Sequence, residues 1–184
     1  MINFPYPLRL PFQNALTGAT YFLVSGDQIE PTPDQLLAIA RCANEPLVYD
    51  LLFRERFEGE PYQETDAAGW ITWTHAGWKD NTHFSFMVQD NAGGVVAACD
   101  IKSNDLEGAE MGYWSSTHHR GVMTNAVKLM CQEAAKAGFR ALTARTKRGN
   151  DKSRAVLQRV GFQDVASPDD ERYDHYLLQL DVRS

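Results

Sequence analysis

The stretch AEMGYWSSTHHRGVMTNAVKLM, residues 109–130, decides the fold of this chain. Its first six residues, Ala109–Trp114, are rich in strand-forming side chains and predict a β-strand. An Arg-Gly pair at 120–121 then marks a turn, and from Val122 onward apolar residues recur at helical spacing. Gly138 predicts the end of this helix, because glycine readily adopts the left-handed conformation that closes many helices. The stretch therefore predicts a strand, a glycine turn and a helix in direct succession.

The same alternation continues toward the C-terminus. A short strand is predicted at Ala141–Thr146 and a helix at Asp151–Val160, which stops on Gly161-Phe162 as the previous helix stops on a glycine. The last predicted strand runs from Tyr173 to Val182. A strand–helix–strand–helix unit of this kind lies at the centre of a mixed α/β domain.

Upstream of residue 109 the pattern predicts a β-hairpin preceded by helices. The hairpin strands are His83–Val88 and Val95–Ile101, joined by a turn at 91–94 that contains two glycines. No repeat or interdomain linker interrupts the chain, so residues 1–184 are predicted to form a single domain. The remaining predicted elements are an irregular arm or short strand at 1–19, a strand at 20–24, and helices at 33–44, 47–53 and 65–81.

Composition and cysteine usage limit the class of protein. The chain is 43% hydrophobic and 23% charged, as in ordinary globular proteins. No stretch approaches the roughly 20 apolar residues of a membrane span, and residues 1–7 do not resemble a secretory signal. Cys42, Cys99 and Cys131 form no CxxC pair and have no metal-ligand spacing. They are interpreted as reduced thiols of a cytoplasmic protein without a metal site.

The charges are distributed unevenly. The net charge is −6, yet the segment from His118 to Arg154 holds nine cations against only Glu133 and Asp151, which leaves the remainder at −13. A basic segment within an acidic protein suggests that one face binds a polyanion. A phosphorylated cofactor or a nucleic acid would satisfy this pattern, and solvated helix faces account for part of it.

Taken together, these motifs resemble the GNAT superfamily of N-acetyltransferases. The strand, glycine turn and helix of residues 109–127 are similar to the family's central strand, phosphate loop and helix. Asn150-Asp151-Lys152-Ser153, followed by Gly161-Phe162, is similar to its N-x-x-S…G-F signature. The AE-x-GYW run at Ala109–Trp114 resembles RimJ/RimL-like members. The resemblance spans residues 83–182 and implies an α/β (α+β) fold with a central mixed, mostly antiparallel sheet flanked by helices.

The resemblance implies acetyl-CoA as co-substrate, with its pyrophosphate at the start of the helix near residue 121. A helix N-terminus offers unpaired N–H groups and the positive end of the dipole, and a glycine lets the backbone approach closely. Gly121 could also be an ordinary turn glycine, and Asn150 could be a helix cap. The implied cofactor-binding residues are Met111, Gly112, Tyr113, Arg120, Gly121, Val122, Met123, Thr124, Asn150, Ser153 and Arg154.

The phosphate loop departs from the family pattern. It is about two residues short, so either His119 stands where the family's first glycine does or two residues are missing after Gly121. Either change reduces the number of N–H groups expected to face phosphate. His118 and His119 could also contact phosphate directly.

Two residues carry the implied proton transfers. Glu110 resembles the general base of RimL-like enzymes, acting on the amine through water, although a glutamate here could also be a strand-edge surface residue. The tyrosine that many members use as the acid for the leaving thiolate is replaced by Leu157. Ser153 matches the serine that has this role in RimL-like enzymes, and it could also be a simple first-turn helix serine.

The acceptor is defined only as an amine. The acidic balance outside the basic segment favours a cationic acceptor such as a protein N-terminus, a polyamine or an aminoglycoside. An inactive acyl-CoA-binding sensor is the alternative that the short loop leaves open, and monomer and homodimer are both compatible. No nucleic-acid recognition motif or membrane segment is present. Aromatic residues that could line an acceptor pocket, or pack in the core, are Trp70, Trp73, Trp78, Phe84 and Phe86.

Overall fold

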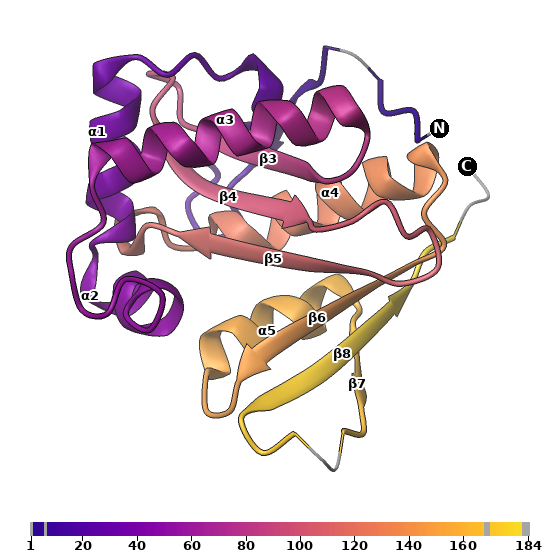
Figure 1. The fold of residues 1–184 in the computed structure, drawn as a ribbon. Coiled ribbons are helices and arrows are strands. Elements are labelled where there is room, and N and C mark those ends of the chain that lie inside the picture. The colour runs from indigo at the N-terminus through magenta and orange to yellow at the C-terminus, as the bar shows by residue number, and fades with distance from the viewer. Residues whose placement is uncertain (1, 6, 168–169, 182–184) are drawn as a thin grey trace.

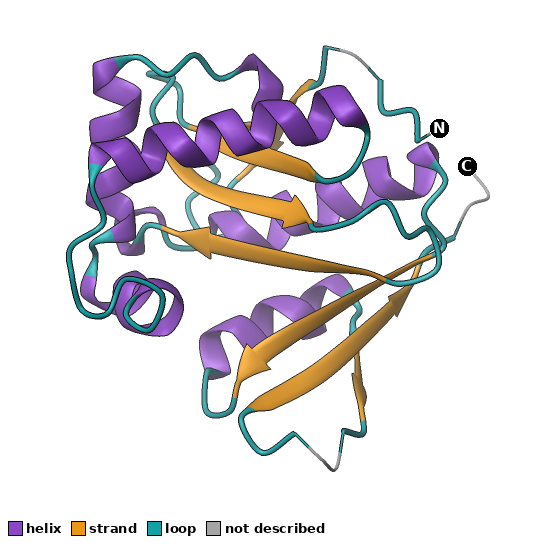
Figure 2. Ribbon diagram, in the orientation of Figure 1, coloured by secondary structure: helices purple, strands orange, loops and turns teal. Residues whose placement is uncertain are grey.

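The computed structural model describes residues 2–5, 7–167 and 170–181. Its eight strands form one sheet in the order β1-β2-β3-β4-β5-β6-β8-β7, in which every neighbouring pair is antiparallel except β5 and β6 (Figures 1 and 2). The mixed, mostly antiparallel sheet predicted from the sequence is thus confirmed. The strands are β1 Arg9–Gln13, β2 Thr20–Ser25, β3 Phe84–Gln89, β4 Val95–Ile101, β5 Ala109–Ser115, β6 Ala141–Lys147, β7 Gln163–Val165 and β8 Tyr173–Gln179.

Helices flank both faces of this sheet. Helices α1 and α3 share a buried cluster with one face, whereas α4 and α5 pack on the other (Figure 1). Each long helix presents an apolar side to the sheet, so both faces contribute to the core. The helices are α1 Pro33–Ala43, α2 Pro46–Val48, α3 Glu64–Asp80, α4 Val122–Ala137 and α5 Asp151–Val160; α2 continues into the π-helical turn η2 Tyr49–Phe53, and η1 Gly26–Gln28 and η3 Thr117–His119 are 3₁₀ turns.

The helix ends follow the capping signals in the sequence. The Thr32 side chain accepts a hydrogen bond from the Gln35 amide at the start of α1, ahead of the proline in the first turn. Asn81 ends α3 in the left-handed conformation. Gly138 and Gly161 close α4 and α5 with φ of 107° and 112°, values that glycine adopts without a Cβ penalty.

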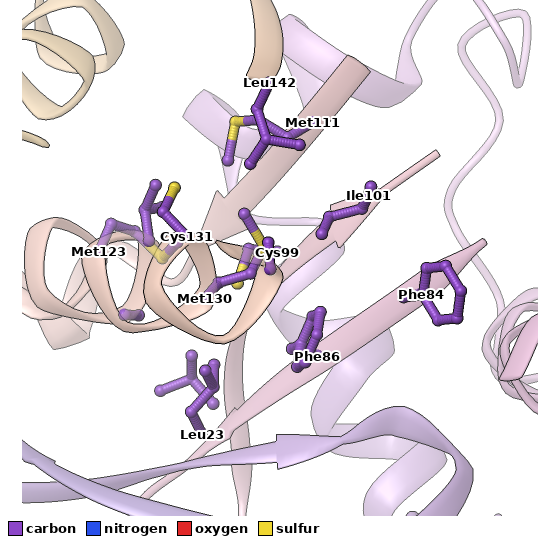
Figure 3. Close-up of a cluster of buried hydrophobic side chains, with 14 of the residues drawn as sticks. Leu23, Phe84, Phe86, Cys99, Ile101, Met111, Met123, Met130, Cys131 and Leu142 are labelled. Carbon is purple, nitrogen blue, oxygen red and sulfur yellow. The ribbon is translucent and has the colours of Figure 1, made fainter. Parts of the chain in front are cut away.

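The larger part of the core lies between the sheet and α4. Side chains such as Phe86, Met111 and Met130 are almost fully buried there (Figure 3). The N-terminal arm belongs to this core, because the Phe4 ring packs 4.9 Å from that of Phe84 and 5.2 Å from that of Trp78. The arm predicted for residues 1–19 therefore contains both a core side chain and β1.

Some boundaries differ from the predicted ones. Strand β7 was not expected, because its three residues are all exposed and show no apolar alternation. Helix α4 begins at Val122 rather than near Arg120, since Gly121 is its cap. Strand β8 ends at Gln179, and the expected end at Val182 lies outside the described residues.

Gly26 follows β2 directly and lies against α3 and β3, so a substitution at this position tests how closely these elements pack. A Cβ at this position would lie 2.3 Å from Thr74 Cγ2 and 2.7 Å from the Ser85 carbonyl oxygen. Gly26→Ala should lower the free energy of unfolding by about 1–3 kcal/mol, the usual cost of overpacking. Gly69→Ala is the matched control, because Gly69 lies inside α3 with open space around it. The control should raise stability by roughly 0.5–1 kcal/mol, and equal urea midpoints for both variants would contradict this packing.

Candidate active site

Strands β5 and β6 separate soon after they begin. They are paired in parallel only at Ala109↔Leu142, Glu110↔Thr143 and Met111↔Ala144, yet β5 continues to Ser115 and β6 to Lys147. Figure 1 shows the two strands diverging toward the end of the sheet near α2. Beyond Met111, the edge of β5 that faces β6 therefore has no paired strand among the described residues. Such backbone groups need hydrogen-bonding partners, and a ligand between the strands can supply them.

The N-terminus of α4 lies directly after β5 and is uncapped. Its N-cap residue is Gly121, with φ of 89° and no side chain to bond the first-turn amides. A Cβ at this position would come within 2.6 Å of Asn14 Oδ1 and Leu16 Cγ, so the β1–β2 loop excludes any larger residue. The Asn14 side chain also donates to the Arg120 carbonyl at 3.0 Å. Uncapped first-turn amides of this kind are suited to binding an anion, and the β1–β2 loop contacts this helix start.

The two histidines of the phosphate loop have different surroundings. The phenol of Tyr21 lies 2.9 Å from His119 Nδ1, which fixes the His119 ring against β2. His118 is exposed, within the short turn η3. Only Arg120 separates the turn η3 from Gly121, the N-cap of α4.

Glu45 connects the phosphate loop to the segment after α1. Its carboxylate accepts hydrogen bonds from the Ser116 hydroxyl at 2.6 Å, the Thr117 amide at 2.5 Å and the Thr117 hydroxyl at 2.6 Å. Burial alone would raise the pKa of Glu45, but these hydrogen bonds outweigh it and leave the pKa below its ordinary value. An ionised carboxylate thus fixes the position of the loop.

Tyr113 and Ser153 meet on the α5 side of the divergence. The Tyr113 phenol lies 2.6 Å from Ser153 Oγ and donates to the Ser153 carbonyl at 3.0 Å. Burial raises the pKa of Tyr113 to about 12, so the phenol keeps its proton at neutral pH. Asn150 Oδ1 accepts from the Ser153 amide at 3.2 Å, which makes Asn150 the cap of α5. The structure thus brings Ser153 together with a second hydroxyl.

The other predicted cofactor residues differ in how far their side chains are available to a ligand. Met111, Val122 and Met123 have side chains in the core, so only their backbone can contact a ligand. Arg120 is exposed and Thr124 half-buried at the start of α4. Arg154 already forms an ion pair with Asp174 at 2.9 Å.

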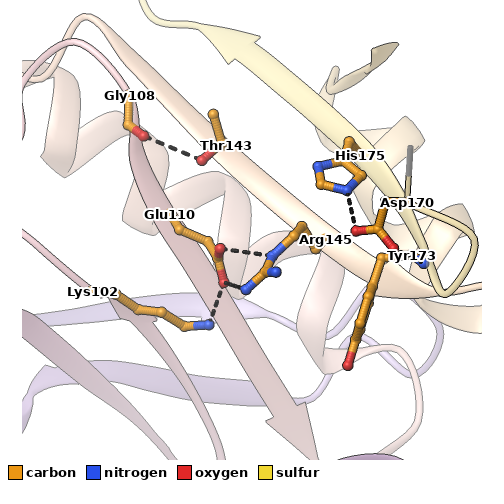
Figure 4. Close-up of polar contacts among 8 residues, drawn as sticks. All are labelled: Lys102, Gly108, Glu110, Thr143, Arg145, Asp170, Tyr173 and His175. Atoms are coloured by element: carbon orange, nitrogen blue, oxygen red, sulfur yellow. Dashed lines mark hydrogen bonds and ion pairs between the residues drawn. The ribbon is translucent and has the colours of Figure 1, made fainter. Parts of the chain in front are cut away.

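Glu110 lies on the opposite face of β5 from Tyr113, since side chains alternate along a strand. Its carboxylate contacts Lys102 Nζ at 2.6 Å and Arg145 Nε at 2.8 Å (Figure 4). Burial alone would raise the pKa of Glu110, but the bonds from these two cations outweigh it and lower the pKa. Arg145 is the first residue of β6 beyond the paired region, so this ion pair bridges the point where the strands part.

Several groups on this face were not identified from the sequence. Asp100 of β4 lies opposite Gly112 of β5, on the same side of the sheet as Glu110. On β8, His175 Nε2 contacts Asp170 Oδ2 at 2.8 Å, next to the Tyr173 ring that Arg145 covers (Figure 4). A carboxylate in an otherwise apolar strand was the available signal for Asp100.

The predicted aromatic residues are divided between core and surface. Trp78, Phe84 and Phe86 pack against one another in the core. Trp70 packs against Trp114 of β5, near the α3-side face of the site. Trp73 is 43% exposed and stacks on His83. Core packing therefore accounts for the first three.

Other features lie apart from the divergence. A cavity of about 490 Å³ is lined by α4, α5 and β8, including Lys128 and Lys136, and contains none of the predicted site residues. Within the described residues, no cluster of His, Cys, Asp or Glu could hold a metal ion. In the same part of the chain, each helix is too short or too polar to cross a bilayer.

Comparison with known proteins identifies the family. The model of the acetyltransferase (GNAT) domain matches residues 29–163, most of the chain. No curated protein sequence matches the chain significantly.

Solved structures share the whole fold. The M. smegmatis RimJ in complex with CoA-disulfide has a TM-score of 0.73 at 16% identity, covering 95% of this chain and 88% of that one. The GNAT domain of S. lividans PAT gives 0.74 at 16% identity, covering 97% and 100%. The ribosomal-protein-S5-alanine acetyltransferase from Vibrio fischeri gives 0.70 at 17% identity, covering 95% and 97%. At such identities the likeness concerns the fold alone.

The lowered pKa of Glu45 predicts a pH-dependent contribution to stability. A carboxylate whose folded pKa is depressed stabilises the protein above its unfolded pKa, and this contribution is lost as the pH falls through the folded value. Glu45→Gln should lower the free energy of unfolding by about 1–2 kcal/mol at pH 7, and the difference should close on acidification below pH 4.5, its ordinary value. Urea titrations of wild type and Glu45→Gln from pH 7 to 3 measure this difference in the free energy of unfolding. Glu30→Gln, which changes an exposed glutamate, is the control. A gap that stays constant with pH would exclude an ionised Glu45.

Proposed function

The chain belongs to the GNAT acetyltransferase family, and we propose that it transfers an acetyl group from acetyl-CoA to a primary amine by direct transfer between the two bound substrates. The observation that carries the proposal is the combination of an unpaired stretch of β5 with the uncapped start of α4 immediately after it. Amide-bearing and phosphate-bearing parts of one long ligand would find hydrogen-bonding partners there in succession.

Acetyl-CoA fits this arrangement as co-substrate. The backbone at 112–115 would bond the amides of its pantetheine arm, and the first-turn amides of α4 would bond the pyrophosphate. Arg120 adds an exposed positive charge beside those amides. The RimJ structure with the same fold contains CoA-disulfide, which supports this site. When bound, acetyl-CoA supplies the thioester whose acetyl group is transferred.

The hydroxyl pair of Tyr113 and Ser153 would protonate the leaving sulfur. Ser153 is the residue that the family resemblance implies, and the 2.6 Å contact with the Tyr113 phenol adds a second proton donor beside it. A phenol whose pKa is raised to about 12 stays protonated throughout the neutral range and is a weak acid, so it would pass a proton to sulfur only while it receives another from the nitrogen.

On the other face of β5, carboxylates would receive the amine. Glu110 is the residue that the resemblance implies as base, acting through water. Its lowered pKa keeps it ionised at neutral pH but also makes it a weak proton acceptor.

The acceptor class is a primary amine. The V. fischeri enzyme of the same fold is named for an alanine of ribosomal protein S5, which supports a protein N-terminus as the first candidate. Polyamines and aminoglycosides remain candidates on charge grounds, because the chain outside the basic segment is acidic. A cytoplasmic location is proposed on the basis of the three free cysteines.

Coenzyme A should raise the melting temperature, because a ligand that binds only the folded state stabilises it, by about 2.7 kcal/mol at 100 times Kd. Arg120→Ala should reduce this shift and its salt dependence by removing one exposed charge at the phosphate site. Lys128→Ala, which removes an exposed charge further along α4, is the matched control. Gly121→Val should abolish the shift. A full shift in Gly121→Val would place the phosphates elsewhere.

Ser153→Ala should lower turnover by less than about 10²-fold, because the Tyr113 phenol remains, whereas Ser153→Ala with Tyr113→Phe should lose about 10²-fold or more. Neither variant should recover at alkaline pH, and both should bind coenzyme A nearly normally. The measurement is thiol release from acetyl-CoA with a peptide bearing a free N-terminus, spermidine and kanamycin. Normal turnover in the double variant would remove the hydroxyl pair from the mechanism, and binding of coenzyme A without release for any amine would favour a sensor module.

A further inference from the structure

Asp100 is a second carboxylate at the divergence of β5 and β6. It is half-buried near the end of β4, and its Cα partner in β5 is Gly112, the first residue beyond the region paired with β6. On the same face of β4, Ala98 and, beyond the bulge, Val95 are buried in the apolar cluster that includes α1 and α3. A carboxylate at the end of such a row is costly unless it has partners or a function.

Gly112 leaves the space that the Asp100 carboxylate occupies. A Cβ at residue 112 would lie 2.9 Å from Asp100 Oδ1 and 3.2 Å from Lys102 Cε, closer than such atoms normally approach. The absence of a side chain at 112 thus brings the carboxylate over the backbone of β5. Gly112 begins the unpaired stretch of β5 that is proposed to bind the pantetheine arm, and it lies at the end farthest along β5 from α4, where the thioester would follow the arm.

The pKa values of the two carboxylates on this face shift in opposite directions. Glu110 uses both oxygens to bind Lys102 and Arg145. Burial raises the pKa of Asp100, and Glu110 adds to the rise, while Lys102, a backbone hydrogen bond from Gly112 and His83 only partly oppose it. On α3, which covers this face, Lys79 and Asp80 are exposed at the C-terminal end, and the His75 ring bonds the Ile29 carbonyl. Paired groups with pKa values driven apart characterise acid–base sites.

Building on the proposed acetyl transfer, we propose that Asp100 is the general base and that Glu110 is a positioning residue that holds Lys102 and Arg145 across the divergence. Asp100 takes one proton from the acceptor's ammonium group and later returns it to water. The nitrogen lone pair forms the bond to the acetyl carbon, and the carbon–sulfur bond breaks. The second proton that nitrogen loses passes through the Tyr113–Ser153 hydroxyls to the sulfur, so the products are an amide and a thiol.

The test compares pH–rate profiles of Asp100→Asn and Glu110→Gln with the best amine among the peptide, spermidine and kanamycin. Asp100→Asn should lower turnover at pH 7 by about 10²-fold or more, and its defect should shrink at alkaline pH, where more of the amine is already neutral. Glu110→Gln should lose activity by a factor that does not change with pH. Asp164→Asn, an exposed carboxylate on β7, is the control for loss of charge and should behave as wild type.

Gly112→Ala provides a variant in which Asp100 stays chemically intact. The added Cβ should displace the Asp100 carboxylate and reproduce most of the Asp100→Asn defect, while the coenzyme A thermal shift shows that the variant is folded. Normal turnover in Gly112→Ala would contradict the position assigned to the carboxylate.

Further outcomes would overturn the proposal. A large, pH-sensitive loss in Glu110→Gln with normal turnover in Asp100→Asn returns the base role to Glu110. A loss in Asp100→Asn that is equal at every pH excludes proton transfer by Asp100. If wild type turns over no amine, the proposed transfer itself fails together with this assignment, whereas an active wild type with an unaffected Asp100→Asn rejects the assignment of Asp100 alone.

Discussion

The parallel pairing of β5 with β6, limited to three residue pairs, is the constraint on which the rest of the site depends. If β5 and β6 were paired along their whole length, their backbone N–H and C=O groups would bond to each other, and no backbone group would be open to an extended ligand. Because they part after Met111, the same sheet that carries the core also presents unpaired backbone at its centre. The α4 N-terminus follows after a short turn, so an uncapped helix end, which is suited to binding an anion, comes directly after the unpaired part of β5.

The divergence is bridged on both faces by side chains. On the α5 side the bridge is the contact of Tyr113 with Ser153, and on the other side it is the ion pair of Glu110 with Arg145. Strand alternation requires this arrangement, because residues 110 and 113 point to opposite faces. It also separates the proposed chemistry, with hydroxyls that give a proton on one face and carboxylates that receive one on the other.

The parts of the fold that rest on local signals were predictable from the sequence. Gly121, Gly138 and Gly161 marked one helix start and two helix ends. They could be recognised locally, because glycine adopts positive φ more easily than any other residue. The contacts that fix the site join distant positions: Asn14 with Arg120, and Glu45 with Thr117. These contacts depend on the positions of the β1–β2 loop and the α1–α2 connection in the folded protein. No local sequence pattern predicts those positions. Asp100 was missed for the same reason, since its partner Gly112 follows from the register of β4 with β5.

Amide hydrogen exchange with and without coenzyme A tests the central claim most directly, because it reports on the backbone groups themselves. The account predicts that saturating coenzyme A slows exchange at residues 112–115 and 121–124 and leaves β3 largely unchanged. Protection that instead appears around Lys128, Lys136 and the end of β8, with no change at 112–115, would place the ligand in the cavity between α4 and β8. That result would contradict the assignment of the cofactor to the divergence of β5 and β6.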